Sequence, residues 1–287
     1  MENASFPTMT PSEVVELIKC VSEGLNDGYF QNAFFLNTDN MLHTVVREYL
    51  LTVIVAQKLH IWTVSNRKYH YSVRLEFKAI EFMKAAFPSY ILSPRENSFL
   101  ELDINGRSEK EIERDGYIDV SLFEDGPNGL QNAPRSIAAI ELKAINPKSS
   151  LAISDLQRLA QILNTTDASM GANSVQFCVL GYINRLDNPN RIFSETQYQQ
   201  LQEEHRASVQ KWLMSVNIGL LNAYVLMRPI TKSTEEEYLQ RINPDEGDYA
   251  DFADAVRETG ALNSVVIILS PTIIQYTPGH EELFSML

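Results

Sequence analysis

The sequence has few cysteines and no long apolar run. Only two of its 287 residues are cysteine, Cys20 and Cys178, and each lies in an apolar stretch without metal-ligand spacing. We therefore expect two buried free thiols rather than a disulfide framework. No segment approaches the roughly 18 apolar residues of a membrane-spanning helix, and the first residues lack the basic start and apolar core of a secretion signal. These absences predict a cytoplasmic protein without a membrane partner.

Several catalytic motifs and an excess of positive charge are also missing. The five histidines are scattered, and no HExxH, GxxxxGK[ST], GxGxxG or GxSxG pattern occurs. The net charge of −13 argues against a general nucleic-acid coat protein. Residues 61–100 nevertheless hold six basic and three acidic side chains, and residues 131–160 hold four and two. Either these windows form a locally positive cleft on an acidic body, or their grouping is accidental.

Apolar residues make up 44% of the chain and charged residues 21%, which is typical of a globular protein. Hydrophobic periodicity predicts helices over residues 11–26, 39–59, 73–87, 151–163 and 194–216. It predicts strands over residues 98–105, 116–123, 136–145, 175–183, 218–227 and 263–276. We expect an α/β (α+β) fold with a mixed central sheet flanked by helices, divided into an N-terminal helical extension (1–72), a core (73–230) and a C-terminal extension packed on that core (231–287).

The chain is organised around residues 116–145, where two predicted strands are interrupted by charged residues. Asp119 lies in the first strand, and Glu141 and Lys143 lie two positions apart in the second, so the latter two share a face. Burying an unpaired charge in a sheet is costly, so these side chains should have strong partners. If the strands pair, two carboxylates and an ammonium converge, which favours a divalent-cation site. The alternative is an ordinary surface ion pair between Glu141 and Lys143 with no metal.

This element order, with Asp119 followed by the Glu141-Leu142-Lys143 tripeptide on the next strand, resembles the PD-(D/E)XK nuclease superfamily. The resemblance covers about residues 73–183 and implies a restriction-endonuclease-like αβββαβ core. It places Glu76 on the first helix and Gln157 on the helix after the third strand. Ile118 stands where the family motif has proline, a departure that touches no ligand.

The resemblance implies a Mg²⁺-dependent or Mn²⁺-dependent endodeoxyribonuclease of restriction or phage-defence type. Its implied metal ligands are Asp119, Glu141, the Leu142 backbone carbonyl and Glu76, with Glu81 and Glu48 competing for the role of Glu76. Lys143 would act on the attacking water and on the charge of the transition state, and Gln157 would position a phosphate or a metal-bound water. Three further cations would contact backbone phosphates: Lys78, Lys148 and Arg158.

Two other functions stay open at this point. Residues 191–287 hold 7 basic and 14 acidic side chains and should repel DNA unless they face away, which favours a catalytically inactive interaction module on the same fold. RNA is a further substrate, since nothing in the sequence separates it from DNA. By analogy with the family, a homodimer or an accessory protein would be the protein partner.

Overall fold

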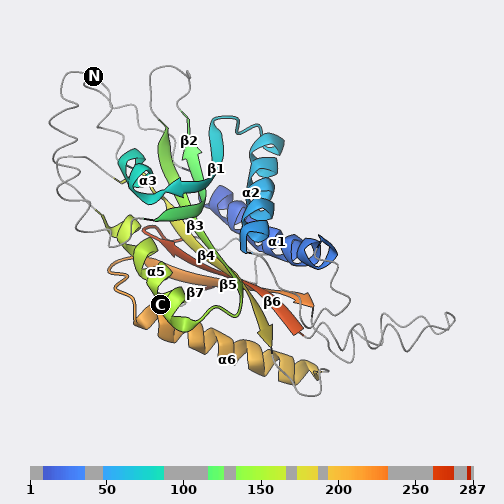
Figure 1. The fold of residues 1–287 in the computed structure, drawn as a ribbon. Helices are drawn as coiled ribbons and strands as arrows, with labels where there is room; N and C mark the ends of the chain where they lie inside the picture. Colours follow the sequence, from blue (N-terminus) through green and yellow to red (C-terminus); the bar gives the residue numbers. More distant parts are fainter. Residues whose placement is uncertain are drawn as a thin grey trace, which may run out of the picture.

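A seven-stranded mixed sheet runs through the centre of the protein, in the order β1-β2-β3-β4-β6-β5-β7 (Figure 1). The computed structural model describes residues 9–35, 48–86, 116–125, 134–165, 173–186, 193–231, 261–274 and 283–285. The strands are β1 (Tyr71–Lys78), β2 (Tyr117–Glu124), β3 (Arg135–Ile145), β4 (Phe177–Leu186), β5 (Asn222–Thr231), β6 (Ala261–Ser270) and β7 (Leu283–Ser285). Only the β3–β4 pair is parallel among these strands, so the predicted mixed sheet is confirmed.

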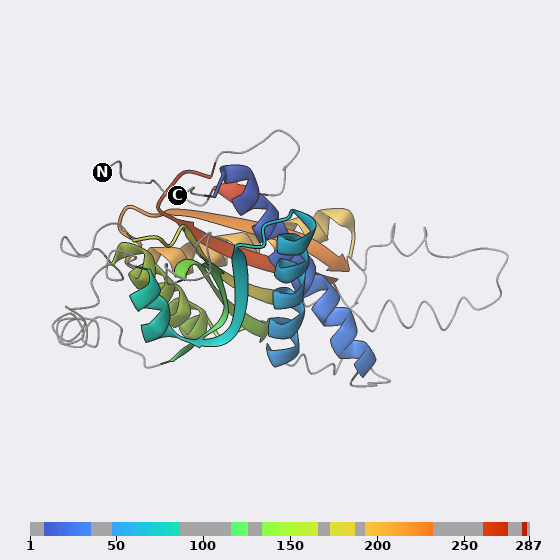
Figure 2. The ribbon, with the colours of Figure 1, turned by 90° about the horizontal axis from the view of Figure 1, so that it is seen from above.

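Helices cover both faces of the sheet. They are α1 (Pro11–Phe35), α2 (Glu48–Ser65), α3 (Ala79–Ala85), α5 (Ser149–Asn164) and α6 (Glu195–Met214). Helices α1 and α2 pack on one face and α3, α5 and α6 on the other, each side with its own buried apolar cluster (Figures 1 and 2). No helix within the described ranges is both long and apolar enough to cross a membrane. Both cysteines are free thiols; Cys178 is buried as expected, whereas Cys20 is only partly buried.

The segment predicted as one helix over residues 73–87 begins as a strand and continues as a short helix, so the prediction was wrong for its first part. Strand β1 ends at Lys78, and only the short helix α3 follows it. The apolar residues Val73, Leu75 and Phe77 alternate with charged ones, which is the period of a strand, and β1 pairs with β2 on both sides of Glu76. The helix before the three-strand meander is therefore α2, and the meander is β1, β2 and β3.

The predicted strand over residues 98–105 lies outside the described residues. The three-part division of the chain stays a prediction, but the sheet continues across its boundary at residue 230. Strand β6 comes from the predicted C-terminal extension and lies between β4 and β5, with all ten of its residues buried. The order of strands in a sheet depends on long-range packing, which local sequence patterns do not contain.

Gly24 lies in the middle of α1, at the point where α2 crosses it. A Cβ added at Gly24 would lie 2.7 Å from the Val55 Cα. We expect Gly24→Ala to destabilise the fold by about 1–3 kcal/mol in urea denaturation, because backbone contact cannot be relieved by a rotamer change. Gly28→Ala is the matched control. Its Cβ would lie 2.8 Å from the flexible end of the Leu51 side chain, so its loss of folding stability should be smaller than that of Gly24→Ala. Equal stability of Gly24→Ala and wild type would contradict the close crossing.

Candidate functional site

Strands β2 and β3 bring together the three charged residues that the sequence singled out. Their antiparallel register pairs Val120 with Ile140, which puts Asp119 beside Glu141. The Asp119 Oδ2 accepts a hydrogen bond of 2.7 Å from the Leu142 backbone N–H. This bond fixes the Asp119 carboxylate against the strand that carries Glu141 and Lys143.

Glu141 is almost completely buried between β3 and α5. Its side chain is 2% exposed, and its Oε1 lies 2.5 Å from the Arg158 Nη2. That contact is an ion pair without hydrogen-bond geometry, so the buried Oε1 accepts no hydrogen bond. Arg158, predicted to contact DNA phosphates, instead lies inside this site, only 11% exposed.

Lys143 links the sheet to two helices. Its Nζ lies 3.5 Å from the Asp155 Oδ2 on α5 and 3.4 Å from the Glu48 Oε1 in the first turn of α2. It also donates a hydrogen bond of 2.9 Å to the Leu142 carbonyl oxygen. The ammonium group is therefore held by carboxylates from both faces of the sheet.

Glu76 lies on β1 rather than on the predicted helix, but it still faces the site. The β1–β2 register places it opposite Asp119, whose pKa it helps to raise. Glu76 has φ = 48°, a left-handed conformation that is uncommon for a non-glycine residue inside a strand. Such strained residues gather at functional sites, where the surrounding structure holds them in place.

The structure distinguishes Glu48 from Glu81, the two alternatives to Glu76 as a metal ligand. Glu48 begins α2, the helix that precedes the meander, and contacts Lys143. Glu81, on α3, forms a 3.1 Å surface ion pair with Lys84 and contacts none of the three central residues among the interactions described. Glu48 therefore lies on the helix before the meander, where the sequence analysis had placed Glu76.

The remaining predicted residues lie at the edge of the site or away from it. The Gln157 Oε1 accepts a hydrogen bond from the Asn217 N–H, after α6, so the structure does not bring Gln157 to the acids. Lys78 ends β1, beside Tyr117 in the register, and Lys148 precedes α5. Both lysines are exposed and can meet a phosphate without desolvating a buried group.

Burial and crowding shift the titration of the central residues. Burial, opposed by Arg158 and reinforced by Asp119 and Asp155, raises the pKa of Glu141 to about 8. Burial also raises the pKa of Asp119, although the Leu142 hydrogen bond and the Lys143 charge act to lower it. Burial alone would lower the pKa of Lys143, but the surrounding carboxylates, led by Asp155, outweigh it and raise that pKa. Lys143 is therefore an ammonium at neutral pH.

We call Glu48, Glu76, Asp119, Glu141 and Asp155 the acidic cluster. Its five carboxyl groups face two basic side chains, Lys143 and Arg158, so fully ionised acids would leave an excess of negative charge. The described residues contain no group of three Asp, Glu, His or Cys side chains placed to hold a metal. A cation here would therefore have two carboxylates, a backbone carbonyl and waters. Mg²⁺ accepts such a set, since it keeps several waters, and the buried Oε1 of Glu141 lacks any hydrogen bond.

Asp155 is the member of the site that the sequence analysis missed. It is 4% exposed and joins Lys143 and Arg158. One signal was available: Asp155 falls at helical spacing with the apolar residues Ala152, Leu159 and Ile162, inside the buried stripe of α5. A carboxylate in such a stripe needs a cationic partner.

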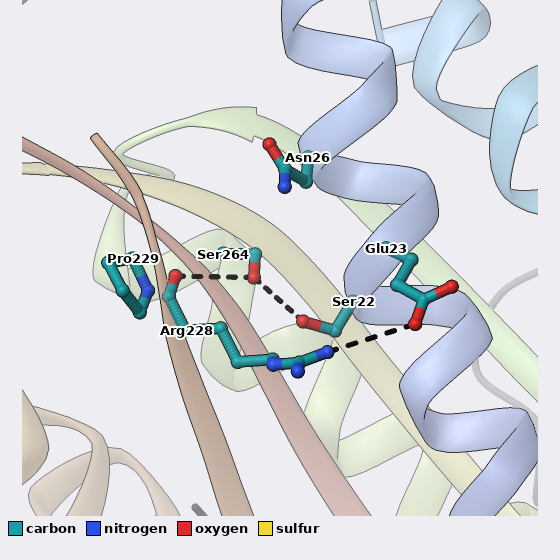
Figure 3. Close-up of a pocket in the computed structure, with 6 residues that line it drawn as sticks. All are labelled: Ser22, Glu23, Asn26, Arg228, Pro229 and Ser264. Carbon is teal, nitrogen blue, oxygen red and sulfur yellow. Dashed lines mark hydrogen bonds and ion pairs between the residues drawn. The ribbon is translucent and has the colours of Figure 1, made fainter.

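A separate polar pocket lies on the opposite face of the sheet, between α1 and strands β5 and β6 (Figure 3). It has a volume of about 330 Å³ and is lined by Ser22, Glu23, Asn26, Arg228, Pro229 and Ser264. The Ser22 and Ser264 hydroxyls are 2.8 Å apart, and the Arg228 Nη1 lies 4.0 Å from the Glu23 Oε1. Its single acid and single base offset each other, so the acidic cluster is the stronger candidate site.

Comparison of the chain with protein-family models, with curated proteins and with solved structures found no match.

Proposed function

We propose that this protein is a metal-dependent endonuclease that hydrolyses phosphodiester bonds in DNA. The observation that carries the proposal is the convergence of Asp119, Glu141 and Lys143 from adjacent strands into a partly buried cluster with an excess of acids. The order α2, β1, β2, β3, α5, β4 supports a restriction-endonuclease-like core, because an antiparallel meander is followed by a helix and a parallel strand.

We assign some residues of the site to binding a cation and others to contacting the substrate. Asp119, Glu141 and the Leu142 carbonyl would hold Mg²⁺ or Mn²⁺, with Glu76 and Glu48 at the edge of the site. When bound, the metal supplies an acidified water and stabilises charge on the phosphate. The Lys143 ammonium cannot act as a base, so we assign it to orienting the attacking water and offsetting transition-state charge.

DNA binding would rest on exposed cations near the site. Lys78 and Lys148 lie at the ends of β1 and of the loop before α5, and both are exposed. Phosphate contacts of this kind position a nucleic acid without reading its bases, so they suit RNA as well as DNA. The substrate assay below therefore includes both.

One observation favours the alternative of a catalytically inactive module. Arg158 already lies 2.5 Å from the Glu141 Oε1, as it would if an arginine contact had replaced the metal. That alternative predicts neither divalent-cation binding nor cleavage of any nucleic acid. The assay of cleavage with Mg²⁺, Mn²⁺ or EDTA separates the two functions.

Asp119→Asn is the sharpest single test of the proposal. Asparagine keeps an oxygen to accept the Leu142 N–H but loses the charge that would bind a cation. We expect cleavage of plasmid, single-stranded DNA or RNA to fall by about 10²–10³-fold, by analogy with the loss of one key electrostatic group. Glu81→Gln, in an exposed ion pair, is the matched control and should retain activity. Metal-independent cleavage, or full activity of Asp119→Asn, would refute the proposed mechanism.

A further inference from the structure

Arg158 lies between two carboxylates and is hydrogen-bonded to only one of them, Asp155. Its Nη2 is 2.5 Å from the Glu141 Oε1 and 3.4 Å from the Asp155 Oδ1. Its Nη1 also lies 3.4 Å from the Tyr117 carbonyl oxygen. The Arg158 Nε and the Glu141 Oε1 are both buried, and neither makes a hydrogen bond. The guanidinium thus meets Glu141 through one nitrogen only.

A second buried arginine, Arg135, forms an ion pair that is also hydrogen-bonded. Arg135 contacts Glu124 through both Nε and Nη2, and these two side chains are 11% and 9% exposed. Both nitrogens approach the same oxygen, Oε2, and the contact from Nε is a charge-assisted hydrogen bond, which is stronger than one between neutral groups. The Arg158–Glu141 pair is similarly buried but has no such hydrogen bond. A second acceptor, Asp155, lies within 3.4 Å of Arg158.

Resting on the proposed function, we propose that a divalent cation and Arg158 compete for Glu141, and that Asp155 is the positioning residue that holds Arg158 away from Glu141 when the cation binds. A cation on Glu141 would stand next to the guanidinium, and like charges at this distance in a buried site repel strongly. Moving the guanidinium away from Glu141, while it stays hydrogen-bonded to Asp155, relieves that repulsion and keeps the arginine paired. Cation binding would thereby rearrange the charge network around the site.

The test is Mn²⁺ binding to the full chain, measured by calorimetry and by the free-Mn²⁺ signal in electron paramagnetic resonance. Removing the competing charge in Arg158→Gln should tighten Mn²⁺ binding by about tenfold or more, the effect of one nearby charge. Arg158→Lys keeps a positive charge but not the planar guanidinium, so its Mn²⁺ affinity should lie between those of wild type and Arg158→Gln. It replaces Arg158→Gln in the test if that variant does not fold. Arg135→Gln, at the matched buried pair, should leave Mn²⁺ affinity unchanged.

A double-mutant cycle tests the role of Asp155. Asp155→Asn alone should weaken Mn²⁺ binding by about tenfold, because Arg158 then stays on Glu141. In the Arg158→Gln background the same substitution should have a much smaller effect, since Asp155 acts through Arg158. Equal effects in both backgrounds would reduce Asp155 to a general source of negative charge and overturn its positioning role.

The outcomes separate this inference from the proposed function. Suppose that wild type binds Mn²⁺ and that neither Arg158→Gln nor Arg158→Lys binds it more tightly. The proposed competition between Arg158 and the cation is then wrong, but the metal site is retained. If Arg158→Gln binds and wild type does not, Arg158 excludes the cation and the competition is supported. If no variant binds Mn²⁺, both the competition and the metal-dependent function fail.

Discussion

Replacing Glu141 with glutamine is expected to remove a large part of the pH dependence of stability and to abolish metal-dependent cleavage. Burial raises the pKa of Glu141 to about 8 in the folded protein, against 4.5 as its ordinary value. Because the folded pKa is the higher one, the group's contribution to stability is fully present below about pH 4.5 and is lost as the pH rises to about 8. At about 1.4 kcal/mol per pKa unit, the loss is of the order of 3–5 kcal/mol.

Denaturation in urea at pH 5 and pH 8.5 measures this effect. The free energy of unfolding of Glu141→Gln, relative to wild type, should rise by about 3–5 kcal/mol between the two pH values. Any constant loss from the broken contact with Arg158 cancels in that comparison. Glu124→Gln, at the other buried arginine pair, controls for the loss of such a pair. A relative stability of Glu141→Gln that does not change with pH would show that Glu141 is ionised throughout.

The central acids could be predicted from the sequence because two local signals coincide there. Asp119, Glu141 and Lys143 interrupt strongly apolar strand patterns, and a short turn-rich segment joins those strands. Strand alternation then fixes which side chains share a face. These are short-range regularities, and the structure follows them closely in β2 and β3.

The rest of the site depends on contacts that no local pattern contains. Arg158 had the appearance of an exposed phosphate ligand, yet burial of Asp155 and Glu141 draws it inward. Glu48 reaches Lys143 only because α2 packs over the end of the meander, 95 residues earlier in the chain. Glu76 was placed on a helix because its segment satisfies helical spacing as well as strand alternation, and pairing with β2 decides between them.

Lys143→Met is expected to reduce the rate of cleavage by about 10²–10⁴-fold, with little change in substrate binding. Methionine keeps the length and apolar stem of lysine but removes the ammonium that Asp155 and Glu48 hold over the Leu142 carbonyl. Because the surrounding carboxylates raise the pKa of Lys143, the missing group is a permanent cation rather than a base. Its loss should therefore lower the rate without adding a new pH dependence near neutrality.

Single-turnover rates and DNA affinity, measured separately, distinguish this role from phosphate binding. Lys78→Met and Lys148→Met are the matched controls, since both lysines are exposed. They should weaken DNA binding and its salt dependence while leaving the rate of bound substrate almost unchanged. If Lys143→Met instead behaves like these two controls, its ammonium contacts substrate phosphate only, and the charge stabilisation proposed for Lys143 is wrong.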